Sequence, residues 1–505
     1  MPCRTPSASA GPTARCCSGV SPADALPVLS QSIAASPAQL RALAALHPAD
    51  FPVLLDSAAS GPLARHTLLA AYPLGTLTLA ATGALQATGA CRVRAGERDF
   101  LGALQRLWEG AAGPLAQVDA GGDPAPFGGG WFVYLGYELA SQIETCLQLP
   151  MPMPAPWPNA QQGPAAEPVA RAWRIAAALI YDHDSGRCTA LAEAGQGELL
   201  RRLVVAVQSV GPEQAEAWLS GLGSAALTHQ PLLEDAPEQF LAAVAVAREA
   251  IARGDIYQAN LSRAWRLQLA PGAYRAAALH ERLRRANPAP FAALVQQDGQ
   301  ALISSSPERL VRVRDGRVAT RPIAGTRPRS GRAGADGYES AELIAHPKER
   351  AEHVMLIDLE RNDLGRICRA GSVHVDEFMV LERYAHVHHI VSNVSGALRA
   401  DVTPMQVLRA VFPGGTITGC PKLRSMQIIA ALEGQTRGAY TGSLGYVNHD
   451  GSMDFNILIR TLSLHGDALS LRAGAGIVAD SLPELELAET RAKARGLLLA
   501  LGLPA

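Results

Sequence analysis

Three tight-turn signals in the C-terminal half of the chain constrain its fold most strongly. Asp315-Gly316 separates two runs of strand character, Val311–Arg314 and Arg317–Arg321, and an Asp-Gly pair in that position is a strong hairpin signal. Asp450-Gly451 marks a second candidate hairpin, and Gly466-Asp467 marks a third turn. Strands joined by such short turns are antiparallel, and helical patterns lie between them. The sequence therefore predicts an α+β (mixed α/β) architecture without βαβ regularity.

Local patterns place several further elements. Apolar residues recur at helical spacing from Phe240 to Ile251, and Gly254 stands where a helix stop belongs. Ile256–Ser262 then reads as a strand. Ala172–Tyr181 reads as one strand that ends in a turn at Asp184-Ser185-Gly186.

Composition excludes several classes of protein. The 505 residues are 48% hydrophobic and 18% charged, which suffices for a sizeable core and argues against global disorder. The 45 basic and 46 acidic side chains nearly balance, so nothing favours binding to nucleic acid or to an anionic membrane. The sequence contains no run of about 18 apolar residues, so no membrane-spanning helix is predicted. Eight cysteines without a C-x-x-C pair fit a reducing, cytoplasmic location.

The composition and residue pattern change along the chain. Residues 1–23 are expected to be a disordered extension, or the product of a start codon assigned too early. Residues 24–200 form an N-terminal region of short apolar runs between Gly, Pro and Asp-rich turns. Pro150–Pro168 holds seven prolines and reads as a surface loop or linker. Residues 237–500 form a second region. No G-x-G-x-x-G or P-loop motif indicates nucleotide binding.

Two predicted helices carry carboxylates three residues apart. Pro347 opens the first helix, which places Glu349 and Glu352 on one face. The second helix begins near Pro483 and places Glu486 and Glu489 in the same relation, with Lys493 four residues further on. The two carboxylate pairs could meet in space around Mg²⁺, which prefers hard oxygen ligands. The alternative is two solvated helix faces, with Lys493 paired to Glu489.

Two glycine-rich segments could approach an anion closely. Pro413–Gly419 runs into Cys420-Pro421-Lys422, and Gly474-Ala475-Gly476 ends a strand just before the second carboxylate helix. Backbone N–H groups in such loops can contact a bound anion. Tight turns in a large domain are the structural alternative. Cys420 precedes a proline and has no surroundings typical of a nucleophile.

Nine ordered blocks between Phe240 and Lys493 resemble the chorismate-utilising enzymes, which include anthranilate synthase component I, aminodeoxychorismate synthase component I, and the isochorismate and salicylate synthases. The N-terminal region matches more loosely, through FPVLLDS and GGWFVYLGYELASQIE. The resemblance implies a chorismate-binding fold, in which antiparallel sheets form a β-sandwich flanked by helices and the two regions pack intimately. The nine blocks are GDIYQANLS, SSSPERL, RPIAGTRPR, KERAEHVMLIDLERNDLGRIC, HVHHIVSNVSG, FPGGTITGCPKLRSMQII, GSLGYV, DFNILIRT and AGAGIVADSLPELELAET.

The resemblance also implies roles for individual residues. Glu308 matches the general acid that protonates the departing 4-hydroxyl of chorismate, and His389 matches a histidine beside the ring. Glu352 and Glu489 match Mg²⁺ ligands, with Glu349 and Glu486 as supporting acids. The positions that match contacts to the substrate carboxylates are Gly325, Thr326, Tyr446, Arg460, Gly474, Ala475, Gly476 and Lys493. One cation, one Arg and one Lys would offset the charge of the chorismate dianion.

Two positions bear on which reaction is catalysed. Gln258 stands where the water-adding relatives carry a lysine base, and a glutamine cannot activate water in that way. This favours transfer of ammonia, which needs no such activation. QANLS, SPER, DLERND, VHH and DFNILIRT resemble aminodeoxychorismate synthase. Ala324, in place of a lysine proposed to attack C2 of the ring, resembles anthranilate synthase. The expected product is 4-amino-4-deoxychorismate, with Asn260 directing ammonia to C4; anthranilate is the alternative.

The resemblance implies a partner and a second pocket. The chain carries no G-x-C-x-G glutaminase block, so ammonia is expected from a separate glutamine amidotransferase subunit or from solution. Ser57, Pro290 and Phe291 match a regulatory or structural tryptophan pocket in the family. An inactive regulatory relative is a further alternative, although such a protein would be expected to lose carboxylates and this chain keeps them.

Overall fold

The computed structural model describes residues 26–59, 61, 63–114, 124–151, 167–225, 227, 229–272, 274–328, 347–383 and 387–503. For residues 324–328, 347–349, 383, 387 and 388 it describes the backbone alone. The predicted extension at residues 1–23 and most of the proline-rich segment at 150–168 lie outside the described residues.

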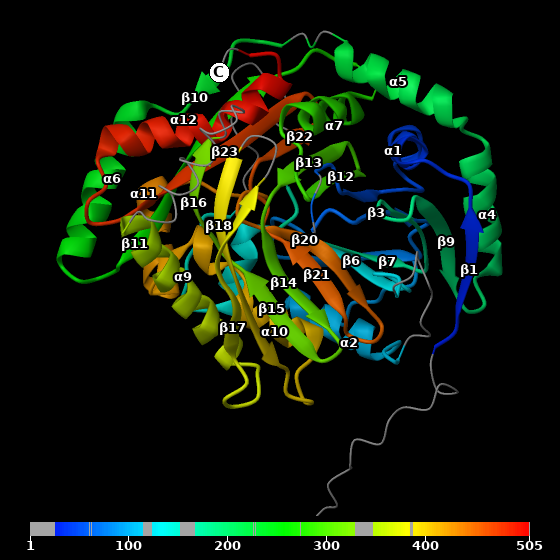
Figure 1. The fold of residues 1–505 in the computed structure, drawn as a ribbon, viewed down its shortest axis with the longest axis horizontal. Coiled ribbons are helices and arrows are strands. Elements are labelled where there is room, and N and C mark those ends of the chain that lie inside the picture. The colour runs from blue at the N-terminus through cyan, green and yellow to red at the C-terminus, as the bar shows by residue number, and fades with distance from the viewer. Residues whose placement is uncertain are drawn as a thin grey trace, which may run out of the picture.

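Two large antiparallel sheets form the centre of the molecule (Figure 1). In the described part of the chain the first sheet has 12 strands, with β19 paired to β11 beside the main path. Its strands, in spatial order, are β1 (Val28–Ile33), β9 (Arg187–Glu193), β8 (Ala177–Asp182), β3 (His66–Ala71), β2 (Val53–Asp56), β12 (Phe291–Gln297), β13 (Gln300–Ser306), β22 (Thr461–His465), β23 (Ala468–Ile477), β11 (Gln258–Gln268) and β10 (Leu233–Glu234), with β19 at Gly419–Cys420.

The second sheet has 11 described strands, with β17 paired to β18 beside the main path. Each sheet joins one block of strands from the first 200 residues to one block from later in the chain: β2 pairs with β12 in the first sheet, and β6 pairs with β20 in the second. The strands of the second sheet, in order, are β16 (Ile323–Pro328), β18 (Val387–Ala397), β15 (Arg317–Arg321), β14 (Arg309–Arg314), β21 (Met453–Asn456), β20 (Ser443–Asn448), β6 (Gly130–Leu135), β7 (Ala170–Ile175), β4 (Gly75–Leu79) and β5 (Leu85–Ala87), with β17 at His374–Arg383.

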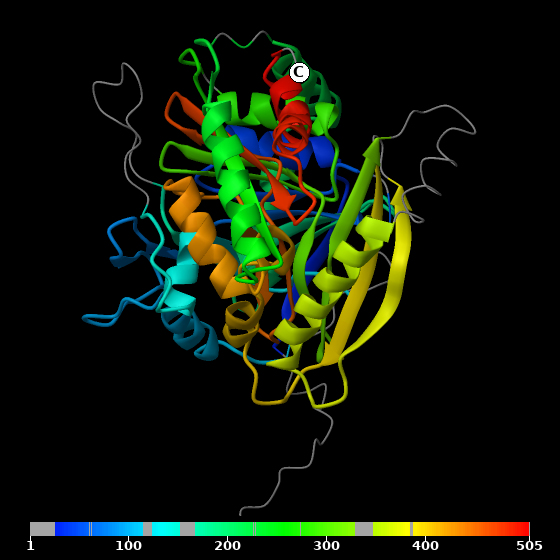
Figure 2. The same ribbon diagram turned by 90° about the vertical axis from the view of Figure 1, so that its left-hand side faces the viewer.

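Helices cover the outer face of each sheet, which makes four layers. One cluster of buried apolar residues joins the first sheet to α1 (Pro37–Leu46), α4 (Gly197–Gln208), α7 (Arg275–Ala286) and α12 (Pro483–Ala500). Another joins the second sheet to α2 (Phe100–Glu109), α9 (Pro347–Gly365) and α10 (Pro404–Val411). Figure 2 shows α9 lying against β17 and β18. The other elements are α3 (Ala140–Ile143), α5 (Pro212–Ser224), α6 (Pro237–Ala252), α11 (Lys422–Glu433) and the short 3₁₀ turns η2 (Tyr137–Leu139) and η3 (Gly415–Ile417).

The apolar runs of the sequence reflect burial on both faces of these strands. Leu68 and Ala70 of β3 enter the core between the sheets, whereas Leu69 and Ala71 enter the core beneath the helices. Successive residues of a strand point to opposite faces, so a strand covered on both sides carries no polar alternation. The described helices include none long and apolar enough to cross a membrane, as the sequence predicts.

The predicted turns and helices are confirmed. Asp315 and Gly316 adopt φ values of 51° and 70°, as a two-residue hairpin turn with both central residues left-handed requires, and they join β14 to β15. Asp450-Gly451 joins β20 to β21, and Gly466-Asp467 joins β22 to β23. The helix predicted before Gly254 is α6, and both carboxylate helices form as α9 and α12. The architecture is the predicted α+β sandwich flanked by helices.

One predicted strand is wrong in its extent. Ala172–Tyr181 belongs to two strands, because β7 lies in the second sheet and β8 lies in the first. The chain passes from one sheet to the other at Ala176, which is fully buried. Because residues on both sides of this crossing are buried, no Gly, Pro or polar residue marks it in the sequence. The predicted strand at Ile256–Ser262 begins at Gln258 and continues to Gln268.

Candidate active site

The site is built where two chain segments cross together from one sheet to the other. Glu308 lies on the crossing from β13 to β14, and Arg460 lies on the crossing from β21 to β22. The N–H of Ile457 donates to the carbonyl of Glu308 at 3.0 Å, and the N–H of Ser305 donates to the carbonyl of Arg460 at 3.0 Å. The two crossings therefore hold each other in place and present an acid and a cation side by side.

Glu308 has the environment of a proton donor. Its side chain is buried, and Thr416 Oγ1 donates to its Oε1 at 2.7 Å. Burial raises the pKa of Glu308 to about 7, although the Thr416 hydrogen bond and the charges of Arg460 and Lys493 act in the opposite direction. A carboxyl group with that pKa is half protonated near neutral pH, which suits general acid catalysis.

Arg460 is placed to receive an anion. Its backbone adopts a left-handed φ of 53°, an uncommon conformation for a residue other than glycine. Its side chain is half-buried and makes no hydrogen bond to another residue in the described part of the chain. Burial lowers the pKa of Arg460, and the charges of Tyr440 and Glu308 oppose that effect, as does that of Glu489. Strained backbone at a half-buried, unpaired guanidinium is typical of a ligand-binding position.

Two glycines of β23 leave room beside this pair for side chains of β11, and the recess is the region bounded by Glu308, Arg460, Asn260, Gly474 and Gly476. Asn260 and Ser262 of β11 lie opposite Gly476 and Gly474 of β23, so β23 carries no side chain at these two positions. A Cβ atom at position 476 would lie 2.5 Å from Gln258 Nε2, and one at position 474 would lie 2.8 Å from Asn260 Oδ1. Glycine is therefore required at both positions for the β11 side chains to occupy the recess.

The recess contains buried oxygens without a protein partner. Gln258 Nε2 donates to Glu352 Oε1 at 2.8 Å, which joins β11 to α9. Gln258 Oε1 and Asn260 Oδ1 have no hydrogen-bond partner among the described residues. A buried polar atom without a partner is costly, so both oxygens are poised for a ligand.

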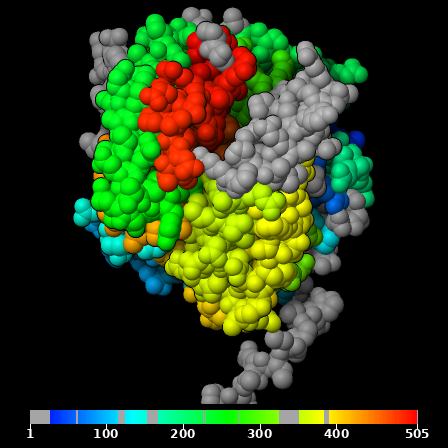
Figure 3. Space-filling view, turned by 60° about the vertical axis from the view of Figure 1, so that its left-hand side comes forward, coloured from blue at the N-terminus to red at the C-terminus, as the bar shows by residue number. Residues whose placement is uncertain are grey.

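The second carboxylate helix borders the same region. Figure 3 shows α6, α9 and α12 on one face of the molecule, with a hollow beside α12. Glu486 of α12 is buried, whereas Glu489 is exposed and pairs with Lys493 at 2.6 Å, the contact that the alternative interpretation of this helix predicts. The described side chains form no ready-made group of three His, Cys, Asp or Glu ligands. The side chain of Glu349 lies outside the described residues.

Other predicted residues are placed as follows. His389 of β18 is buried, and its backbone pairs with Thr326 of β16, so these two predicted site residues are neighbours. The side chains of Ala324 and Thr326 lie outside the described residues, and for Gly325 the backbone alone is described. Ser57 Oγ donates to the carbonyl of His66 at 2.7 Å and lies 3.4 Å from that of Pro290, so Ser57 and Pro290, both assigned to the predicted tryptophan pocket, are neighbours. Phe291 follows as the first residue of β12.

Tyr446 does not lie with Arg460. It packs between the sheets, with its ring 5.9 Å from that of Phe127, and burial raises its pKa together with the charge of Asp454. Tyr440 is the tyrosine beside Arg460, and its hydroxyl lies 2.7 Å from the position of a Cβ at Gly474. Sequence reasoning missed Tyr440, six residues earlier. Tyr440 lies in a turn in which Thr441 adopts a φ of 65°, a feature that the structure shows and the sequence does not.

Comparison with known proteins assigns the family. The profile of the chorismate binding enzymes matches residues 76–499. An anthranilate synthase component I-like protein of Synechocystis sp. is 40% identical over 379 residues, 74% of this chain and 73% of the relative. Aminodeoxychorismate synthase component 1 of Bacillus subtilis is 46% identical over 273 residues, 55% of this chain and 59% of the relative.

A solved structure supports this family assignment. The crystal structure of anthranilate synthase component I from Streptococcus pneumoniae matches with a TM-score of 0.72 and 30% identity over 87% of this chain and 93% of that chain. The chain belongs to the chorismate binding enzyme family. It is accordingly an enzyme that acts on chorismate, and the recess between Glu308, Arg460 and the two glycines is its candidate substrate site.

Replacement of Thr416 by valine should shift the pH dependence of the reaction. The rate should fall as pH rises through about 7, because Glu308 donates its proton only when protonated. The Thr416 hydrogen bond stabilises the carboxylate, so Thr416→Val should move this alkaline limb upward by roughly one pH unit, the equivalent of one hydrogen bond. The measurement is kcat/KM against pH. If the alkaline limb stays at the same pH or moves to lower pH, Glu308 is not the general acid.

Proposed function

We propose that the protein is component I of aminodeoxychorismate synthase, which converts chorismate and ammonia into 4-amino-4-deoxychorismate for the synthesis of 4-aminobenzoate and folate. The observation that carries the proposal is the pair Gln258 and Asn260 in the recess. Gln258 supplies an amide where activation of water needs a titratable base. Asn260 supplies a buried oxygen, without a protein partner, that can accept a hydrogen bond from ammonia.

The chemistry follows from the named residues. Glu308 protonates the 4-hydroxyl, the C4–O bond breaks and water leaves. Ammonia forms the new C4–N bond and then loses a proton. The charges of Arg460 and Lys493 offset the two substrate carboxylates, with Gly325, Thr326 and the Gly474–Gly476 backbone as further contacts. Ala324 has no nucleophile, so no enzyme-linked intermediate forms at that position.

Magnesium is the proposed cofactor. The donors near the recess are hard oxygens, namely the carboxylates of α9 and α12 and the unpartnered amide oxygen of Gln258, and Mg²⁺ selects such ligands. Glu352 and Glu489 would hold the ion, with Glu349 and Glu486 beside them. A bound cation would offset carboxylate charge on the substrate. Ammonia would come from a separate glutamine amidotransferase subunit, and a cytoplasmic location agrees with the free cysteines of the described chain.

Anthranilate synthesis is the second candidate. Ala324 favours it, as do the relatives named anthranilate synthase component 1, such as that of Aquifex aeolicus, which is 47% identical over 264 residues but covers only 53% of the relative. The minor alternative, an inactive regulatory relative, conflicts with the presence of Glu308, Glu352 and Glu489.

Glu308→Gln should fold and bind chorismate but lose roughly 10²–10⁴-fold in kcat, the usual contribution of a general acid. Chorismate consumption and chorismate affinity are measured separately. Glu281→Gln is the matched control, because Glu281 is equally buried and pairs with Arg41 of α1, which is not a residue of the site. Loss of rate together with loss of the fold in Glu308→Gln would favour a structural role.

Glu352→Gln and Glu489→Gln should each abolish turnover at ordinary Mg²⁺ concentrations, because each removes an anionic ligand from a hard cation. The measurement is rate against Mg²⁺ concentration. The controls are Asp358→Asn and Glu484→Gln, exposed carboxylates on the same two helices. A variant at 352 or 489 with the Mg²⁺ dependence of the wild type would exclude that residue from the metal site.

The wild type should form aminodeoxychorismate from chorismate, Mg²⁺ and ammonium. Ala324→Lys should keep that product, whereas Asn260→Val should reduce it or let anthranilate appear, because valine neither donates nor accepts a hydrogen bond. Anthranilate fluoresces directly, whereas aminodeoxychorismate is detected by mass and, after a lyase step, as 4-aminobenzoate. Asn393→Val, the same change on β18, is the control. If anthranilate is the sole product of the wild type, the assignment as an aminodeoxychorismate synthase is wrong.

A further inference from the structure

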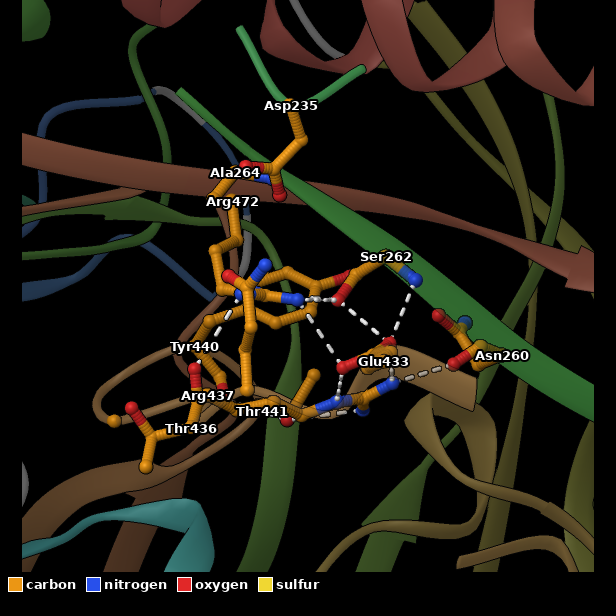
Figure 4. Close-up of polar contacts among 12 residues, drawn as sticks. Asp235, Asn260, Ser262, Ala264, Glu433, Thr436, Arg437, Tyr440, Thr441 and Arg472 are labelled. Carbon is orange, nitrogen blue, oxygen red and sulfur yellow. Dashed lines mark hydrogen bonds and ion pairs between the residues drawn. The ribbon is translucent and has the colours of Figure 1, made fainter. Parts of the chain in front are cut away.

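A buried ion-pair cluster lies beside Asn260 and Ser262 of β11 (Figure 4). Glu433, the last residue of α11, accepts from Arg437 Nε at 3.0 Å and from Arg472 Nη2 at 3.1 Å. Its Oε1 also accepts from the N–H and hydroxyl of Ser262, both at 2.8 Å. The three charged side chains are 1–8% exposed, so the whole cluster is removed from water.

Arg437 spreads its five N–H donors over four parts of the chain. Two of them bond Glu433, and Nη2 also donates to the backbone carbonyl of Asn260 at 2.6 Å. Nη1 donates to the carbonyl of Ile417 at 3.3 Å and to Thr441 Oγ1 at 3.4 Å. The guanidinium also lies 5.6 Å from the centre of the Tyr440 ring.

Each of these segments carries a residue of the candidate site. Asn260 itself lines the recess. Thr416, which hydrogen-bonds Glu308, directly precedes Ile417. Tyr440, the tyrosine beside Arg460, directly precedes Thr441. One planar side chain thus ties together the strand, the loop and the turn that surround the substrate position.

Neither stability nor ligand binding accounts well for this cluster. Ion pairs buried in this way often contribute no more stability than apolar residues of the same size, because desolvation offsets their attraction. Burial raises the pKa of Glu433, but Arg437 and Arg472 outweigh it and keep this carboxylate ionised. All donors of Arg437 are already used within the protein, so the cluster is not itself an anion site.

We propose that Arg437, oriented by Glu433 and Arg472, is a positioning residue that sets the geometry of the chorismate recess by fixing Asn260, the Thr416 loop and the Tyr440 turn relative to one another. The proposal rests on the candidate site of the proposed function, but it does not depend on whether the product is aminodeoxychorismate or anthranilate.

Arg437→Lys tests this directly. Lysine keeps the charge beside Glu433 but cannot direct donors to four partners in one plane. We expect KM for chorismate to rise at least tenfold in the full-length protein supplied with ammonium and Mg²⁺. A purely structural role would lower the folded fraction, which reduces the apparent kcat but leaves KM unchanged. A KM within twofold of the wild-type value would overturn the proposal.

Arg41→Lys is the matched control. Arg41 and Glu281 form another buried pair, at 2.8 Å with both side chains at most 5% exposed, between α1 and α7. This variant should lose thermal stability to a comparable degree and retain the wild-type KM. An equal rise of KM in Arg41→Lys would show that the effect follows from general destabilisation and would overturn the proposal.

Chemical rescue provides a second measurement. In Arg437→Ala, millimolar guanidinium should restore part of the affinity for chorismate, whereas methylammonium should not, because only guanidinium reproduces the planar fork. Rescue by both cations, or by neither, would contradict the proposal. If Arg437→Ala does not fold, Glu433→Gln replaces it, with the same expected rise in KM and without the rescue.

The outcome can be separated from failure of the proposed function. Wild-type turnover of chorismate is measured first. If the wild type binds chorismate without turning it over, the proposed function fails, and the same variants are compared by their dissociation constants for chorismate. If the wild type does not bind chorismate, both proposals are overturned.

Discussion

The paired crossings between the two sheets are the constraint on which the rest of the site depends. Strands β13 and β22 pair in the first sheet, and strands β14 and β21, which adjoin them in the sequence, pair in the second. Two segments of the chain therefore pass from one sheet to the other at the same point. Two backbone hydrogen bonds at 3.0 Å, between Ile457 and Glu308 and between Ser305 and Arg460, leave neither crossing free to move alone. Any shift of the acid therefore moves the cation with it.

This constraint also explains the electrostatics of the site. A residue on a crossing lies at the edge of the core between two sheets, where it can be buried without belonging to either strand ladder. Burial raises the pKa of Glu308 to about 7, and the nearby cations limit the rise without abolishing it. Arg460 remains half-buried and unpaired within the described chain, because its left-handed backbone directs the chain from one sheet to the other. The fold thus places an acid that is half protonated near neutral pH next to a guanidinium without a hydrogen-bond partner in the described chain.

Much of this arrangement could be predicted from the sequence, and the exceptions share one cause. Turn residues identified the three hairpins, and helical spacing identified α9 and α12, because both signals are local. The division of Ala172–Tyr181 between two sheets gives no local signal, since the crossing is buried on both sides. Tyr440 was missed for a related reason: it lies two residues before the GSLGYV block that contains Tyr446, and only the tertiary packing shows that Tyr440 lies beside Arg460.

The arrangement separates the choice of product from the departure of the hydroxyl. The proton donor lies on a crossing held by backbone hydrogen bonds, whereas the side chains that would meet the nucleophile lie on β11, opposite glycines that contribute no side chains of their own. In the proposed reaction, a change at Asn260 would therefore alter the approach of ammonia without disturbing Glu308. Ala324 lies on a different strand, β16. The absence of a lysine there would remove one proposed route to C4 but leave the β11 side of the recess, with oxygens unpartnered among the described residues, to direct the nucleophile.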